Sequence, residues 1–202
     1  MNISVQKGAK QASPTCVCRV HKIGDSGDFP GNARLVFRPD AFADRLSAVS
    51  LDELAGRGIA GIIVDLDNTL VGYGQDELTD ECSAWIALAK ARGFAIVLLS
   101  NNFTGRVDRI SKALGVPAIS SALKPLPWAF ARALRVLGTP RDKTTVVGDQ
   151  LFTDVLGAKL LGLHSILTRP LVAKDWHGTR ILRFLERLVL GRWDDRPGET
   201  PP

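Results

Sequence analysis

Two aspartates, Asp65 and Asp67, follow the apolar run from Gly61 to Val64 at a spacing of two residues. Side chains alternate along a strand, but the backbone turns where a strand ends, so both carboxylates can lean over one opening at the sheet edge. Carboxylates that close repel each other unless a cation neutralises them. Mg2+ prefers oxygen ligands and keeps waters that a phosphate can displace. The pair indicates magnesium-dependent phosphate chemistry, although aspartates also end strands and begin turns through local hydrogen bonds.

Residues that can bind phosphate also follow the next two apolar runs. Ser100 and Asn101 come directly after the run from Ala95 to Leu99. There the serine hydroxyl can donate to a phosphate oxygen beside the free N–H groups of a helix start. Lys124 precedes Pro125 after the following run, and its ammonium group can neutralise both phosphate and carboxylates. Each residue has an ordinary explanation as well, since serine and asparagine cap helices and most lysines are solvated.

A fourth apolar run, Thr144 to Val147, leads into Gly148 and Asp149. Gly148 lets the backbone turn tightly and Asp149 can reach a metal, while Asp154 lies one turn further on and can support the cluster. Alone, Asp154 would pass as an acidic residue favoured at a helix N-terminus. Four consecutive strand ends that each carry such a residue are difficult to attribute to chance.

The apolar runs have the length of strands, and helical patterns separate them. The predicted strands cover residues 61–66, 94–99, 116–119, 144–147 and 164–167, and the predicted helices cover residues 79–92, 105–114, 127–137 and 153–161. Ahead of them, an amphipathic stretch from Pro39 to Leu46 and a capping-box pattern at Ser50 predict further helical turns. Strands and helices that alternate in this way predict a parallel sheet covered on both faces, with ligands beyond the carboxyl ends of the strands.

Taken in order, the four strand-end groups resemble the four motifs of the haloacid dehalogenase (HAD) superfamily of phosphatases. They are Asp65-Leu66-Asp67-Asn68-Thr69, Ser100, Lys124 with Pro125, and Gly148-Asp149 through Asp154. The segments Phe37 to Phe42 and Gly148 to Ala158, with a basic C-terminal helix, resemble class III of the superfamily, the YqeG-type subfamily, which is similar to phosphatidylglycerophosphate phosphatase. The resemblance implies an α/β fold with a three-layer Rossmann-like core and a parallel sheet.

The resemblance also implies a role for each motif residue. Asp65 attacks phosphorus to give an aspartyl-phosphate, and Asp67 acts as the general acid and base. Mg2+ is held by Asp65, Asp149 and the backbone carbonyl of Asp67. The remaining implied residues are Ser100, Asn101 and Lys124 as phosphate ligands, with Thr69 and Asp154 as supporting residues.

Size and composition suit one folded domain. The chain has 202 residues, of which 45% are hydrophobic, and we place the domain at residues 33–193, after a disordered leader (1–32) and before a flexible tail (194–202). No apolar run approaches the roughly 20 residues that span a bilayer, and the leader lacks the apolar core of a secretory signal, so we expect a cytoplasmic protein. The three cysteines agree with a reducing compartment, and Cys16 and Cys18 lack the spacing of a zinc site.

The connections after Asp67 and Ser100 are too short to hold a cap domain, so we expect a capless, open site. Such a site offers few side chains to enclose a small metabolite, so it favours a substrate that a surface presents, as a lipid headgroup or a macromolecule would be. The expected partner is a phosphorylated small molecule or a lipid headgroup. Residues 179–190 predict a basic amphipathic helix that either contacts an anionic membrane or packs on the core. Peripheral contact with the membrane is therefore one expectation for the protein's location.

Three functions remain open from the sequence. They are a phosphatidylglycerophosphate phosphatase, a soluble phosphatase for a nucleotide, sugar phosphate or phosphoprotein, and a non-catalytic module that binds phosphate or nucleic acid. The net charge of +5 is compatible with any anionic partner. The acidic pair and Lys124 speak against the third function, and the sequence has no aromatic stacking motif of the kind that RNA modules use, so no nucleic-acid partner is expected.

Overall fold

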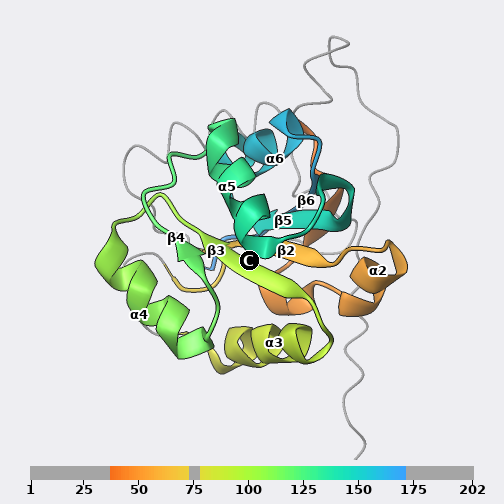
Figure 1. The fold of residues 1–202 in the computed structure, drawn as a ribbon. Helices are drawn as coiled ribbons and strands as arrows, with labels where there is room; N and C mark the ends of the chain where they lie inside the picture. The colour runs from red at the N-terminus through yellow and green to blue at the C-terminus, as the bar shows by residue number, and fades with distance from the viewer. Residues whose placement is uncertain (1–36, 73–77, 172–202) are drawn as a thin grey trace, which may run out of the picture.

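A computed structural model of the chain describes residues 37–72 and 78–171. These residues form one parallel sheet of six strands between two layers of helices (Figure 1). The fold therefore confirms the predicted three-layer α/β core. The leader, the tail and the predicted helix at residues 179–190 lie outside the described residues.

The sheet has the order β1-β6-β5-β2-β3-β4, and every neighbouring pair of strands is parallel. Its strands are β1 (Ala41–Ala43), β2 (Gly61–Asp65), β3 (Ala95–Leu99), β4 (Ala118–Ile119), β5 (Thr144–Gly148) and β6 (His164–Thr168). The helices are α2 (Leu51–Gly56), α3 (Asp80–Ala91), α4 (Thr104–Leu114), α5 (Pro127–Leu137) and α6 (Leu156–Leu160), with 3-10 turns at Leu46–Ala48 and Arg141–Lys143. Five of the six strands lie where the apolar runs predict them.

The two faces of the sheet have separate cores because side chains alternate along each strand. Ile62 and Val64 of β2 pack in the core that α2, α3 and α4 cover. Ile63, between them, points to the opposite face and packs in the core that includes Phe130 of α5 and Ala158 of α6. Figure 1 shows α3 and α4 on one side of the sheet, and α5 and α6 on the other. Burial on both faces explains why β2 is apolar without interruption.

Local sequence sets the helix ends as predicted. The Thr79 hydroxyl accepts a hydrogen bond from the N–H of Cys82 at 3.2 Å and so caps α3. α5 begins with Pro127, whose fixed φ suits the first helical position, and ends before Gly138 in the left-handed conformation. Because α4 follows β3 and α5 follows β4, both helices begin at the carboxyl edge of the sheet, where the motif residues lie.

Two predicted elements are wrong in detail. The stretch from Pro39 to Leu46 is not helical before its last residue, because Ala41–Ala43 form the edge strand β1 and pair with β6. The predicted helix over 153–161 begins earlier, as a π-helical turn at Leu151–Val155, and then continues as α6. This turn arises because the N–H groups of both Asp154 and Val155 donate to the carbonyl of Gln150.

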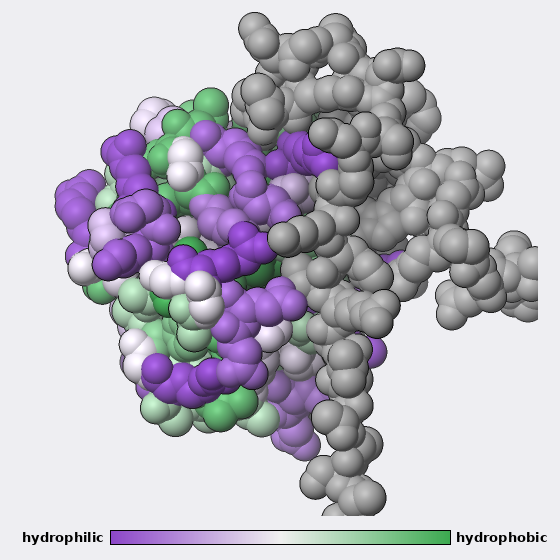
Figure 2. Space-filling model, turned by 90° about the vertical axis from the view of Figure 1, so that its right-hand side faces the viewer, coloured by the Kyte–Doolittle hydropathy of each residue, from purple (hydrophilic) through white to green (hydrophobic). Residues whose placement is uncertain are grey.

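On the face shown in Figure 2, hydrophilic side chains predominate over the described part, with small groups of apolar side chains between them. Within residues 37–72 and 78–171, every helix is too short or too polar to cross a bilayer.

Candidate active site

The register of the central strands brings the motif residues to one edge. Asp65 is the last residue of β2 and pairs with Leu99, the last residue of β3, so Ser100 lies just past the end of β3. On the other side of β2, Val64 pairs with Val147, which places Asp149 just past the end of β5. Because parallel strands end at the same edge, side chains remote in sequence meet there.

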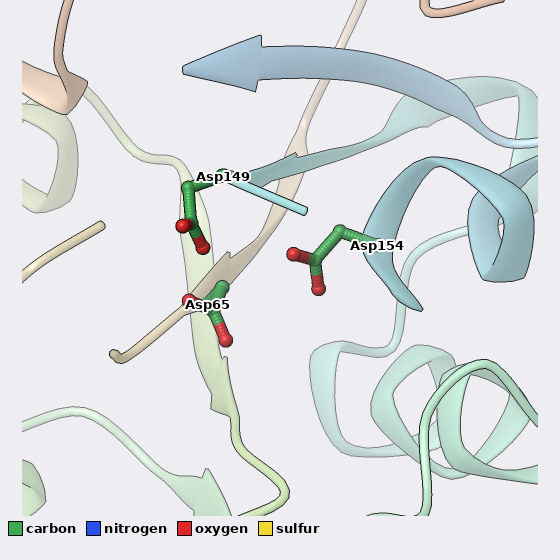
Figure 3. Close-up of side chains that lie close together, drawn as sticks. All are labelled: Asp65, Asp149 and Asp154. Carbon is green, nitrogen blue, oxygen red and sulfur yellow. The ribbon is translucent and has the colours of Figure 1, made fainter. Parts of the chain in front are cut away.

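Three buried carboxylates converge at this edge, those of Asp65, Asp149 and Asp154 (Figure 3). One oxygen of each lies within 4.8 Å of the others. Asp154 comes close because Gly148 has no side chain: a Cβ there would lie 2.4 Å from the Asp154 carboxyl carbon. The carboxylate of Asp154, expected only to support the site, is thus part of the cluster itself.

Lys124 joins two of these carboxylates from the loop after β4. Its Nζ lies 2.5 Å from Asp65 Oδ1 and 2.7 Å from Asp154 Oδ1, and all three side chains are buried. Burial by itself lowers the pKa of Lys124, but the carboxylates of Asp154 and Asp65 outweigh it and hold the pKa above its ordinary value. The lysine is therefore a fixed cation at the base of the site.

Asp65 lies in a strongly desolvated position. Burial raises its pKa to about 7, the neighbouring Asp154 and Asp67 act in the same direction, and Lys124 opposes them. Among the described residues, Asp65 Oδ2 is buried and accepts no hydrogen bond. That oxygen is available to a metal ion or to phosphorus.

The cluster fits a divalent cation. Three carboxylates against the one ammonium of Lys124 leave two negative charges in excess when all four groups are ionised. The donors are carboxylate oxygens, which suit Mg2+. Both oxygens of Asp154 already accept hydrogen bonds, from Lys124 and from the N–H of Gln150 at 3.2 Å. Asp154 is thus less available to the ion than Asp65, whose Oδ2 accepts no hydrogen bond from the described residues.

Asp67 lies apart from the carboxylate cluster. Its Oδ2 accepts a hydrogen bond from the Ser100 hydroxyl at 3.2 Å, and its Oδ1 is paired with the guanidinium of Arg106. The Ser100 oxygen also accepts from the N–H of Asn102 at 3.0 Å. The two aspartates of the motif therefore have different environments: Lys124 contacts Asp65, and Arg106 contacts Asp67.

Asn101 and Thr69 occupy supporting positions. The Asn101 amide accepts from the Lys124 N–H at 2.7 Å and donates to the Lys124 carbonyl at 3.2 Å, which fixes the loop that carries the lysine. Thr69, the last residue of the first motif, is buried, and its hydroxyl has no hydrogen-bond partner among the described residues. Asn101, which the sequence predicts as a phosphate ligand, thus holds the backbone of Lys124 in place in this structure.

Sequence reasoning missed Arg106. It lies in the first turn of α4, where the helix dipole disfavours a cation by roughly 0.3–1 kcal/mol. A basic residue at such a position calls for an acidic partner, and that signal could have pointed to Arg106.

An open parallel sheet whose carboxyl edge gathers four aspartates, a serine and a buried lysine defines an α/β enzyme built to handle phosphate. Residues 31–162 match the sequence model of haloacid dehalogenase-like hydrolases, and the chain belongs to this family. The resemblance read from the four motifs is confirmed.

Two curated relatives narrow the class. The chain is 39% identical over 154 residues to the probable phosphatase YqeG of Bacillus subtilis (strain 168), covering 76% of this chain and 90% of that protein. It is 27% identical over 184 residues to the chloroplastic phosphatidylglycerophosphate phosphatase 1 of Chlamydomonas reinhardtii, covering 86% and 68% of the two chains. The chain is accordingly a phosphatase of the haloacid dehalogenase family and is similar to YqeG.

One solved structure with a similar fold is that of an uncharacterised protein from Listeria monocytogenes serotype 4b. The TM-score is 0.47 at 20% identity, and the match covers 65% of this chain and 99% of the other.

Proposed function

We propose that the chain is a Mg2+-dependent phosphomonoester hydrolase that works through an aspartyl-phosphate on Asp65. The observation that carries this proposal is the environment of Asp65. Its Oδ1 contacts the ammonium of Lys124, while its buried Oδ2 accepts no hydrogen bond from the described residues. A carboxylate nucleophile needs one free oxygen and a cation nearby, and Asp65 has both.

Two displacements complete the reaction. Asp65 Oδ2 attacks phosphorus, the bond from phosphorus to the substrate oxygen breaks, and a protonated Asp67 gives its proton to that leaving oxygen. Water then attacks the aspartyl-phosphate and loses a proton to Asp67, the bond from phosphorus to Asp65 breaks, and inorganic phosphate leaves. Each group ends in the state in which it began.

The donor set proposed for Mg2+ is Asp65, Asp149 and the backbone carbonyl of Asp67. The ion supplies positive charge that favours the ionised form of Asp65 and offsets charge on the transferring phosphoryl group. Asp154, with both oxygens engaged, orients Lys124 toward the same place.

Lys124 and Ser100 are the proposed ligands of the phosphate oxygens. Ser100 donates to Asp67 in this structure, so its proton would turn from Asp67 to the phosphate when substrate binds. Asn101 contributes by holding the backbone of Lys124.

Phosphate release from p-nitrophenyl phosphate with Mg2+ tests the proposal. Asp65→Asn should abolish turnover while the circular dichroism spectrum stays that of the wild type. Asp142→Asn is the matched control, because Asp142 is an exposed residue in the 3-10 turn before β5, at the opposite edge of the sheet. Retained turnover in Asp65→Asn would sink the assignment.

For the substrate, we infer a phosphorylated lipid headgroup, with phosphatidylglycerophosphate as the first candidate. Two observations support it. One is the similarity to a phosphatidylglycerophosphate phosphatase. The other is an apolar rim at the carboxyl edge, made by exposed side chains on the loops and helix starts there: Phe103, Leu123, Trp128 and Leu171.

The apolar rim borders the motif loops directly. Phe103 follows the Ser100 loop and is 81% exposed, and Leu123 precedes Lys124 and is 61% exposed. Hydrogen bonds join these two loops, since the N–H of Ser121 donates to the Asn102 carbonyl at 2.9 Å. Exposed apolar side chains around an open site suit contact with a lipid surface that presents the phosphate.

Replacing two rim residues tests the lipid substrate. The double variant carries Phe103→Ser, a good helix cap, and Leu123→Asn, which tolerates the left-handed backbone at φ 60. Turnover of phosphatidylglycerophosphate in anionic vesicles should fall about tenfold, because losing roughly 1.4 kcal/mol of insertion energy changes binding by that factor. Turnover of p-nitrophenyl phosphate should stay unchanged.

The control for the rim variant is Leu160→Asn, at the end of α6 on the opposite edge of the sheet, where Leu160 is 52% exposed. Equal losses on the vesicle and soluble substrates, or no hydrolysis of phosphatidylglycerophosphate by the wild type, would favour the soluble phosphatase with a small-molecule substrate.

A further inference from the structure

We propose that Arg106 is a positioning residue that sets the carboxyl group of Asp67 for proton transfer to the leaving group. This inference rests on the proposed function, in which Asp67 is the acid and base. Arg106 lies outside the four motifs and reaches the site from the first turn of α4. Its side chain is only 13% exposed, and that of Asp67 15%.

Arg106 ties together the two ends of the turn that carries Asp67. One nitrogen of its guanidinium, Nη1, pairs with Asp67 Oδ1, and the other, Nη2, donates to the Gly72 carbonyl at 3.1 Å. Between these two points the turn closes on itself, because the N–H of Asn68 donates to the Val71 carbonyl at 2.7 Å. A planar guanidinium can hold both acceptors at once, which a single ammonium cannot do in the same geometry.

The carboxyl group of Asp67 is held from two sides. Arg106 contacts Oδ1, and the Ser100 hydroxyl donates to Oδ2 at 3.2 Å. In this structure the group therefore cannot rotate without breaking one contact, and when the Ser100 hydroxyl turns to the phosphate the contact with Arg106 is the one that remains. An acid catalyst depends on such fixation, since a misplacement of about 1 Å can cost on the order of 100-fold in rate.

Two other roles for Arg106 make different predictions. As a ligand of the substrate phosphate, Arg106 would affect all substrates equally and mainly through KM. As a purely structural residue, it would affect the free energy of unfolding but not the dependence of the rate on the leaving group. A residue that acts through Asp67 matters most when the leaving oxygen needs a proton.

The experiment measures kcat/KM with Mg2+ for a series of phosphomonoesters, from 2,4-dinitrophenyl phosphate, whose leaving group needs no proton, to an alkyl phosphate, whose leaving group does. This ratio reports the first displacement and is independent of phosphoenzyme hydrolysis. The variants are Arg106→Gln, Arg106→Lys and Asp67→Asn. Arg109→Gln is the control, because Arg109 is exposed one turn further along α4.

For Arg106→Gln we expect a loss of about 100-fold on the alkyl ester and less than about threefold on the dinitrophenyl ester, since general acid catalysis contributes about 10²–10⁴. Arg106→Lys should fall between Arg106→Gln and wild type. The double variant Arg106→Gln/Asp67→Asn should be no slower than Asp67→Asn alone, because both changes act through the same acid, Asp67. Arg109→Gln should match the wild type.

Three results would overturn the inference. The first is a uniform loss in Arg106→Gln across the series, which would make Arg106 a phosphate ligand. The second is a leaving-group dependence in Asp67→Asn that Arg106→Gln and Arg106→Lys do not share. The third is the absence of a leaving-group dependence in Asp67→Asn. That result would contradict the acid role of Asp67 and so the proposed mechanism, whereas the second result would leave the mechanism intact.

Discussion

At the scale of single residues, the site depends on the lack of a side chain at Gly148. Asp154 can lie against the end of β5 because Gly148 has only hydrogen where other residues carry a Cβ. This approach lets Asp154 reach Lys124 and lets Lys124 reach Asp65. The close contact between the Gly148 backbone and the Asp154 carboxylate thus positions the ammonium group of Lys124 next to Asp65, the proposed nucleophile.

Gly148→Ala should break this arrangement. The new Cβ would lie 2.4 Å from the Asp154 carboxyl carbon, so Asp154 must move away from Lys124. We expect a loss of about 1–3 kcal/mol in the free energy of unfolding, as for other overpacked sites. Turnover of p-nitrophenyl phosphate should fall by on the order of 100-fold, given the sensitivity of catalysis to small misplacements.

The control for this change is Gly56→Ala in α2, where an added Cβ meets nothing within 4 Å. That variant should keep wild-type turnover and lose no stability. If Gly148→Ala also kept wild-type turnover, the position of Asp154 would have no part in catalysis.

The motif residues could be predicted from sequence because each follows a strand that the apolar pattern reveals. Asp65, Ser100, Lys124 and Asp149 all lie at the predicted edge. The contact of Arg106 with Asp67 could not, because a helix pattern does not tell which way a long side chain turns at a helix start. That contact becomes visible only when the packing of α4 against the first motif is known.

At the scale of elements, a partly buried polar contact joins β6 to β5 at the first residue of β6. Thr145 is in register with His164, and its hydroxyl lies 2.8 Å from His164 Nδ1. Burial lowers the pKa of His164 below its ordinary value of 6.5, an effect that Arg57 and Lys159 reinforce and that Asp40 opposes. The folded protein therefore favours neutral His164.

This pKa shift predicts a stability that depends on pH. Because the folded protein binds this proton less readily than the unfolded chain, its stability should fall as the pH drops through 6.5 and below. Denaturant unfolding between about pH 7.5 and 5.5 should show a steeper loss for the wild type than for His164→Asn. Equal slopes in the two proteins would contradict the prediction. Asp40→Asn, which removes the opposing carboxylate, should steepen the loss.

Strand and helix positions followed from sequence wherever an element was long enough to show its period. β1 escaped prediction because three residues, Ala41–Ala43, are too few to show alternation. It is nevertheless fixed by tertiary contacts, since Asp40 accepts hydrogen bonds from the N–H and hydroxyl of Ser165. The π-helical turn at Leu151–Val155 escaped because a one-residue change in hydrogen bonding leaves no mark on the apolar pattern.

At the scale of the whole molecule, the carboxylate cluster costs stability when no cation is bound. Three buried carboxylates repel one another, and Lys124 neutralises only one charge. A ligand that binds only the folded state stabilises it by mass action, by about 2.7 kcal/mol at a concentration 100 times its Kd. The fold and the proposed metal site are thus linked energetically.

Added Mg2+ should therefore raise the Tm, at roughly 2–4 °C per kcal/mol of stabilisation for a domain of this size. Asp149→Asn should remove most of this increase, and its Tm without Mg2+ should not fall below that of the wild type, because one repelling charge is gone. Asp142→Asn, far from the cluster, should respond as the wild type does. A full increase in Asp149→Asn would exclude Asp149 as a ligand.

The central claim is that phosphate passes through Asp65. The most direct test is acid-quenched peptide mass spectrometry of Asp67→Asn after reaction with 2,4-dinitrophenyl phosphate and Mg2+. This variant keeps the nucleophile, and the leaving group of this substrate needs no acid. The variant lacks the base that activates water, so the phosphoenzyme should accumulate. We predict a phosphorylated peptide with the label on Asp65, and no label in the double variant Asp65→Asn/Asp67→Asn. A label on another residue, or its persistence in the double variant, would contradict the claim.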